Sequence, residues 1–217
     1  MFGGLKLKFD LPYYAQSSDF TCGPACVLMV MKQFDHQVRL SRALEFEVWR
    51  QCNMIGVRGA DPYGLSVPLI DAGYDVHLIT GRHKIFENRT WKRRLARHFS
   101  REEIDLCVFG IRQNRLRALS RGIRIEYKHP SVLDLIRNMQ SGFLPIALVH
   151  MGVVHSLDIP HWVVVAGVDT ESVVFNDPYP PKGGKAIRLS HVKFQKILDD
   201  IGKKIGLSPS IVFVRRS

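Results

Sequence analysis

A continuous apolar run at residues 162–168 (WVVVAGV) constrains the fold more than any other segment of the chain. An unbroken apolar run of this length is typical of a strand that is buried on both faces, whereas a half-exposed strand alternates apolar and polar residues. Secondary structure must therefore cover each side of this strand. Further strands are predicted around it in the last third of the chain, at residues 144–150, 173–175, 186–189 and 210–214.

Segments with helical character come before most of these strands. Ser41, Asp61 and Ser100 are residue types that cap helix N-termini, and Glu103 completes a capping box with Ser100. Helices are expected at residues 22–33, from residue 41 onward, and at residues 65–72, 90–99, 100–119, 131–140 and 191–201, with strands at residues 74–80 and 123–127. Helices first and strands last indicate an α+β fold, with the helical N-terminal part packed on an antiparallel sheet.

The length of the chain suits one domain with a sizeable core. We expect a single domain over residues 1–217, with a helical part at about 15–142 and a β-rich part at about 143–217, and a first strand within residues 1–9. No apolar stretch approaches the roughly 18–20 residues that a transmembrane helix needs. The N-terminus also has no signal-peptide hydrophobic region. A cytoplasmic protein without a membrane span is therefore expected.

The four cysteines do not form a recognisable metal or redox motif. In a chain without an export signal they argue against a disulfide scaffold, and Cys22 and Cys26 are four positions apart rather than three. A zinc site would need more ligands, and His150, His155 and His161 are irregularly spaced. No metal or other cofactor is expected. His150 and His155 are expected to line a cleft or to lie at the surface.

The net charge of +11 is concentrated in the middle of the chain. Residues 82–128 hold 14 Lys or Arg and 5 Asp or Glu, and we interpret them as a basic insertion. This segment suits an acidic peptide or protein partner. Contact with nucleic-acid phosphates is the alternative. However, no sequence signature of a nucleic-acid-binding module accompanies the arginines, and such residues on exposed helix faces are commonly only solubilising.

Cys22 stands where a loop is expected to become a helix. Gly23 and Pro24 suit this junction, because glycine allows a close backbone approach and proline early in a helix loses no hydrogen bond. The helix dipole and the unpaired N–H groups at this end favour a thiolate over a thiol, and they can also stabilise an oxyanion. Cys22 is therefore a candidate nucleophile, although most free cysteines are inert and buried.

His161 begins the buried strand, and turn-forming residues 169–172 return the chain toward Asp177. A hairpin here would bring Asp177 near His161, where a carboxylate orients an imidazole and stabilises its protonated form. A structural histidine and an Asp-Pro turn are the alternative interpretation. The separations are 139 positions from Cys22 to His161 and 16 from His161 to Asp177. They match the order and spacing of papain-type cysteine peptidases.

Three motifs together make a more specific resemblance. Residues 16–26, which contain Gln16 and Cys22, residues 161–167 (HWVVVAG) and residues 176–179 (NDPY) are similar to C39-type, bacteriocin-processing cysteine peptidases and to the wider C39-like families. These are papain-like domains best known for cleaving leader peptides, often after a double glycine. The resemblance covers the first 30 residues and roughly residues 145–180.

The resemblance implies a role for four residues. Cys22 would be the nucleophile, His161 the general base and acid, Asp177 the residue that orients His161, and Gln16 an oxyanion-hole donor. Thr21 precedes Cys22 where exporter-fused peptidases usually carry an acidic residue, and the middle of the chain is longer and more basic than a minimal peptidase requires. We therefore expect a stand-alone member without exporter domains.

The expected activity is hydrolysis of a peptide bond by a thiol hydrolase, with peptide or leader processing as one role. Two alternatives remain open at this point. An acyl or peptidyl transferase would use the same residues and the same thioester intermediate. A non-catalytic protein that binds peptides or nucleic acid would use the fold without the chemistry.

Overall fold

An eight-stranded sheet forms the centre of the described part of the chain, residues 6–81 and 89–217 of the computed structural model. The strand order is β5-β4-β10-β6-β7-β8-β9, and β1 pairs with β7 outside this path. The strands of this sheet are β1 (Lys6–Lys8), β4 (Tyr74–Thr80), β5 (Arg124–Tyr127), β6 (Leu144–His150), β7 (Pro160–Asp169), β8 (Ser172–Asp177), β9 (Gly184–Ser190) and β10 (Ser210–Arg216), and a separate pair is formed by β2 (Asn53–Met54) and β3 (Val57–Ala60).

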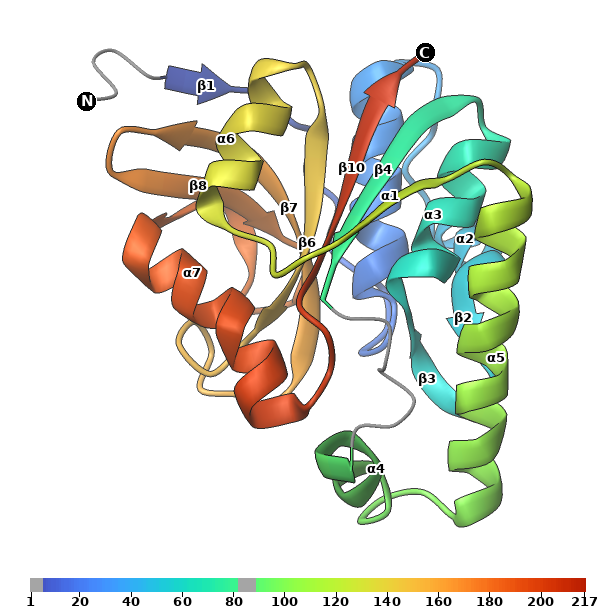
Figure 1. Ribbon diagram of the computed structural model, residues 1–217. Coiled ribbons are helices and arrows are strands. Elements are labelled where there is room, and N and C mark those ends of the chain that lie inside the picture. The colour runs from blue at the N-terminus through green and yellow to red at the C-terminus, as the bar shows by residue number, and fades with distance from the viewer. Residues whose placement is uncertain (1–5, 82–88) are drawn as a thin grey trace.

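Helices lie on both sides of the sheet (Figure 1). They are α1 (Cys22–Phe34), α2 (Arg42–Cys52), α3 (Pro62–Asp71), α4 (Arg89–Leu95), α5 (Arg101–Ser120), α6 (Val132–Gln140) and α7 (His191–Asp200), which continues into a π-helical turn, η2 (Ile201–Ile205). The predicted α+β fold is confirmed.

The strand β7 is buried on both faces, as its apolar run predicts. Trp162 and Val164 belong to the core that β7 shares with α1, α2, α3 and α5, and Val163 and Val165 belong to the core that it shares with α6 and α7. Successive side chains of a strand point to opposite faces, so one apolar run supplies both cores. Burial of this kind stabilises the fold by roughly 25 cal/mol per Å² of apolar surface.

The register of the sheet sets where the two ends of β7 lie. β6 pairs with the first half of β7, with Val149 opposite His161, and β8 pairs with the second half, with Asn176 opposite Val164. Every neighbouring pair in the sheet is antiparallel except β4 and β5, which run parallel. Asp177 therefore ends β8 close to the start of β7, which carries His161.

Helix starts follow the local capping chemistry predicted from the sequence. The side chains of Ser41 and Asp61 accept backbone N–H groups at the starts of α2 and α3, and Ser100 and Glu103 form the capping box of α5. The helix expected at residues 90–99 is shorter: α4 ends at Leu95, and turns follow it. The first strand begins at Lys6, and the part of its prediction on residues 1–5 lies outside the described residues.

Candidate active site

The N-terminus of α1 presents Cys22 beside the central strand. Cys22 is the first residue of the helix and is partly exposed, while Gly23 and Pro24 behind it are buried. A Cβ atom on Gly23 would lie 3.1 Å from Leu65 and 3.2 Å from Trp162. A side chain at this position would crowd Leu65 and Trp162, so glycine allows the helix start to lie close to the strand that carries His161.

His161 and Asp177 form a buried hydrogen bond across the β7–β8 pair. His161 Nε2 lies 2.8 Å from Asp177 Oδ1, and both residues are nearly inaccessible to solvent. The sequence predicted proximity for these two side chains. The structure adds the direct bond, and it leaves Nδ1 of His161 as the ring nitrogen for Cys22.

Cys22 and His161 stabilise each other's charged forms. Burial by itself raises the pKa of the Cys22 thiol, but the charge and hydrogen bond of His161, with backbone bonds from Trp162 and Gly23, outweigh it and leave that pKa below its ordinary value. Burial likewise lowers the pKa of His161, but the Cys22 thiolate and Asp177 raise it to about 9. The pair therefore favours thiolate and imidazolium, the state that a nucleophilic cysteine needs.

Gln16 is buried beside the end of β8. Its backbone N–H donates to the carbonyl of Pro178 over 2.9 Å, and its side-chain Nε2 donates to the carbonyl of Ser18 over 2.8 Å. Its Oε1 has no partner within the described residues. The backbone bond thus ties the segment that carries Gln16 to the residue that follows Asp177.

Glu45 holds the other side of the Gln16 segment. This fully buried carboxylate on α2 accepts the hydroxyl of Tyr14 over 3.0 Å and both the backbone N–H and the hydroxyl of Ser17, over 2.9 and 2.5 Å. Tyr14 and Ser17, which flank residues 15 and 16, are therefore both anchored to α2. The sequence placed Glu45 only near a helix start, since its partners lie on a distant segment.

His155 is a residue of the site that the sequence did not single out. It was expected at the cleft or the surface, but it is 7% exposed and its Nε2 lies 2.6 Å from Asp177 Oδ2. Tyr179 completes the surroundings, because its backbone N–H donates to Asp177 Oδ1 over 2.9 Å. In the sequence, the only indication of this role was that His155 lies shortly before His161, and this spacing did not reveal its contact with Asp177.

A cavity of about 400 Å³ opens beside Cys22. Trp91 and Leu95 of α4, Trp162 of β7 and Leu207 before β10 give it largely apolar walls. The side chains that line it also include Arg94 and Asp158, whose ion pair of 2.7 Å attaches α4 to the connection between β6 and β7. His150, the last residue of β6, bonds to Asp158 over 2.8 Å. The cavity is thus closed on one side by a helix of the basic segment.

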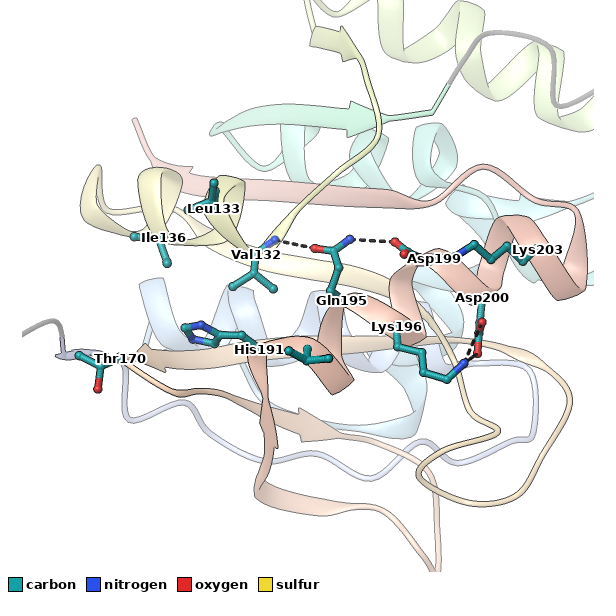
Figure 2. Close-up of a pocket in the computed structure, with 11 residues that line it drawn as sticks. Val132, Leu133, Ile136, Thr170, His191, Gln195, Lys196, Asp199, Asp200 and Lys203 are labelled. Atoms are coloured by element: carbon teal, nitrogen blue, oxygen red, sulfur yellow. Dashed lines mark hydrogen bonds and ion pairs between the residues drawn. The ribbon is translucent and has the colours of Figure 1, made fainter. Parts of the chain in front are cut away.

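A larger hollow of about 670 Å³ lies away from this site, between α6 and α7 (Figure 2). Several of its polar side chains bond within the hollow: Gln195 accepts the backbone N–H of Val132 and donates to Asp199, and Lys196 pairs with Asp200. Neither Cys22 nor His161 borders it. Within residues 6–81 and 89–217, no group of three or more His, Cys, Asp or Glu side chains is arranged to hold a metal ion.

Comparison with known proteins agrees with this geometry. A family model described as Peptidase_C39 like family matches residues 11–196. The chain belongs to this family. No curated protein sequence matches the chain.

Among solved structures, the Peptidase_C39 like chain resembles a C39-like peptidase from Bacillus anthracis, at 14% identity and a TM-score of 0.55, over 98% of this chain and 99% of that one. It also matches the peptidase domain of Streptococcus ComA, a bi-functional ABC transporter involved in a quorum sensing pathway. That match has 14% identity and a TM-score of 0.47, over 97% of this chain and 99% of the other.

The likeness to the Bacillus anthracis structure shows the α+β, papain-like fold that the sequence predicted. Family and fold together support a cysteine peptidase at the family level. No helix in the described part of the chain is long and apolar enough to cross a membrane.

Proposed function

We propose that the protein hydrolyses peptide bonds, with Cys22 as nucleophile, His161 as general base and acid, and Asp177 as the residue that orients His161. The observation that carries this proposal is the bond of 2.8 Å between His161 and the buried Asp177, beside a Cys22 whose pKa the charge of His161 lowers. A thiolate at a helix N-terminus, an imidazolium beside it and a third group that orients the ring, here a buried carboxylate, are the parts of a catalytic cysteine triad.

In the proposed reaction, the Cys22 thiolate attacks the carbonyl carbon of the scissile peptide bond. The tetrahedral oxyanion is stabilised by the backbone N–H of Cys22 at the start of α1 and by the amide of Gln16. His161 then gives its proton to the leaving amine, which departs and leaves a thioester. A water molecule, deprotonated by His161, attacks the thioester and releases the carboxylic acid, which restores the Cys22 thiolate and the His161 imidazolium.

The role of Gln16 as an oxyanion donor is supported by its fixed position. An amide nitrogen carries two hydrogens, and the Nε2 of Gln16 uses one of them on the carbonyl of Ser18. The second hydrogen is left for the substrate. Because the segment is anchored to Pro178 on one side and to Glu45 on the other, this donor is held in place before the oxyanion forms.

The cavity beside Cys22 supports a peptide substrate with an apolar side chain near the scissile bond. Its largely apolar walls suit such a side chain. The exposed Lys92 and Arg93 of α4 and the exposed Arg97 in the turn after it suit acidic residues further along the same peptide. Other cations of the basic segment contact the protein itself: Arg117 bonds to the carbonyl of Gln51, Arg121 to Asp71 and Lys128 to Asp134.

Incubation with a mixture of peptides from a digested proteome tests the proposal. Mass spectrometry of the products is expected to show new peptide ends with the wild-type protein and none with Cys22→Ala, whose fold should be intact. The sequence around the new ends should be enriched in apolar residues, with acidic residues nearby. Products with free carboxylic acids indicate hydrolysis, whereas products joined to an added amine would identify a transferase. Cleavage of equal extent by Cys22→Ala would refute the proposal.

A further inference from the structure

The carboxylate of Asp177 is held by two histidines, and the reaction proposed above uses only one of them. His161 bonds to Oδ1 over 2.8 Å, and His155 bonds to Oδ2 over 2.6 Å. Oδ1 also accepts the backbone N–H of Tyr179. Within the described residues, His155 is thus the partner that the structure gives to the second oxygen of a fully buried carboxylate.

The connection between β6 and β7 is folded so that His155 reaches Asp177. The backbone N–H groups of Val154 and His155 both donate to the carbonyl of Met151, over 3.2 and 2.9 Å. Ser156, directly after His155, has a φ of 58°, in the left-handed region that residues other than glycine seldom adopt. Such a conformation persists where the surroundings impose it, and it is concentrated at functional sites.

The ring of His155 also packs on the site from the side of Tyr179. The two ring centroids are 5.4 Å apart, and the Tyr179 ring lies 6.0 Å from that of His161, edge to face. The Tyr179 ring thus contacts both imidazoles, while its backbone N–H bonds to the carboxylate that they share. The geometry fixes both oxygens of Asp177 in one orientation.

Rotation of a carboxylate about its last torsion is soft, because the preferred angles form broad wells. A bond to Oδ1 alone would leave Asp177 free to turn out of the plane of the His161 ring. We propose that His155 is a positioning residue that locks the Asp177 carboxylate through Oδ2, so that Oδ1 stays aligned with His161 and the Cys22–His161 pair stays ionised. This inference rests on the proposed function.

The other titratable groups around Asp177 do not compete for this role. The hydroxyl of Tyr13 donates to the backbone carbonyl of Asp177, and burial raises the pKa of that hydroxyl. Burial and the nearby charges of Cys22 and Asp177 raise the pKa of Cys26 well above its ordinary value. Both groups stay neutral through the neutral pH range, where Cys22 and His161 exchange their proton.

The test is the pH profile of Cys22 alkylation by iodoacetamide, measured between about pH 5 and pH 9. The modified site is located by fragment ions, because Cys22 and Cys26 lie on one tryptic peptide. In His155→Ala and His155→Leu the carboxylate loses a donor and can turn, so imidazolium and thiolate are both less stabilised. We expect the acid limb of the profile, where the alkylation rate rises as Cys22 ionises, to move up by at least about half a pH unit. At pH values below this limb, the alkylation rate is then about threefold lower.

His155→Gln places an amide N–H near the position of Nε2 and should keep the limb within a few tenths of a unit of the wild-type value. His150→Gln is the matched control, because His150 is also buried, ends β6 directly before the same connection and bonds to Asp158 instead. It should leave the limb in place even if it lowers stability.

The outcomes separate the two proposals. A wild-type Cys22 that reacts only as an ordinary thiol would end the proposed function. A wild-type protein with a reactive thiol at low pH, combined with His155→Ala or His155→Leu profiles that coincide with it, would overturn the role of His155 alone. If His155→Ala and His155→Leu do not fold, the His155→Gln variant decides. An acid limb displaced by more than half a pH unit from the wild-type value, although the donor is present, would also overturn the role of His155.

Discussion

Removal of the Cys22 thiolate should lower the pKa of His161 strongly. The pKa of His161 is raised from 6.5 to about 9, although burial acts in the opposite direction. At about 1.4 kcal/mol per pKa unit, this difference is on the order of 3 kcal/mol in favour of the imidazolium. The charge of Cys22 is the largest contribution to the increase, and its hydrogen bond adds to it.

In Cys22→Ala both contributions disappear, while burial and Asp177 remain. We therefore expect the pKa of His161 to fall by at least about one unit, or roughly 1.4 kcal/mol. Proton–nitrogen correlation spectra of the imidazole ring, recorded as a pH titration, measure this value directly. His161 can be assigned by comparison with a His161→Gln variant, which lacks its signals.

Cys22→Ser is the matched control, because its hydroxyl keeps a hydrogen bond to the ring but does not ionise. Its His161 should titrate close to that of Cys22→Ala if charge is the main cause. A pKa of His161 that stays at about 9 in both variants would refute the ion-pair argument. In the wild-type protein, the sign of the shift also predicts that kcat/KM falls as the pH rises through about 9, because the imidazolium that protonates the leaving amine is then lost.

Three further variants test other parts of the site. Gln16→Ala should lower kcat by about 10²–10³ with an unchanged unfolding midpoint, and a smaller effect than tenfold would argue against an oxyanion role. Glu45→Ala leaves the hydroxyl of the half-buried Tyr14 and the N–H of Ser17 without their acceptor, so urea denaturation should show a loss of about 1 kcal/mol or more; unchanged stability would contradict the proposed anchoring. Arg94→Ala breaks the contact of α4 with Asp158 and should raise KM for an apolar peptide more than it changes kcat, whereas a pure kcat effect would show that α4 does not shape the cavity.

Much of the fold could be predicted because local chemistry determines it. Ser41, Asp61 and Ser100 each cap a helix with their own side chain, a choice that is made within three residues of sequence. The apolar run after His161 predicted burial on two faces because no half-exposed strand would carry it. The end of α4 was misplaced because the residues after Leu95 continue in turns, and helix propensity alone does not mark that change.

The candidate site was predictable only in part for a different reason. The order and separation of Cys22, His161 and Asp177 follow from the arrangement of helix and strands, so the sequence pattern carries them. The bond between His155 and Asp177 depends instead on how the β6–β7 connection folds, including the left-handed Ser156. The partners of Glu45 and the orientation of the Gln16 amide likewise depend on packing between segments far apart in the chain.

The connection between β6 and β7 couples two properties that engineering would seek to change separately. His155, through Asp177, links it to the reactivity of the thiol, and Asp158, through Arg94, links it to the helix that closes the cavity. A graft that alters the length of this connection would therefore change substrate range and nucleophile strength in one step. Substitutions on the cavity side of α4, at Trp91 or Leu95, leave the connection intact and offer the way to alter selectivity alone.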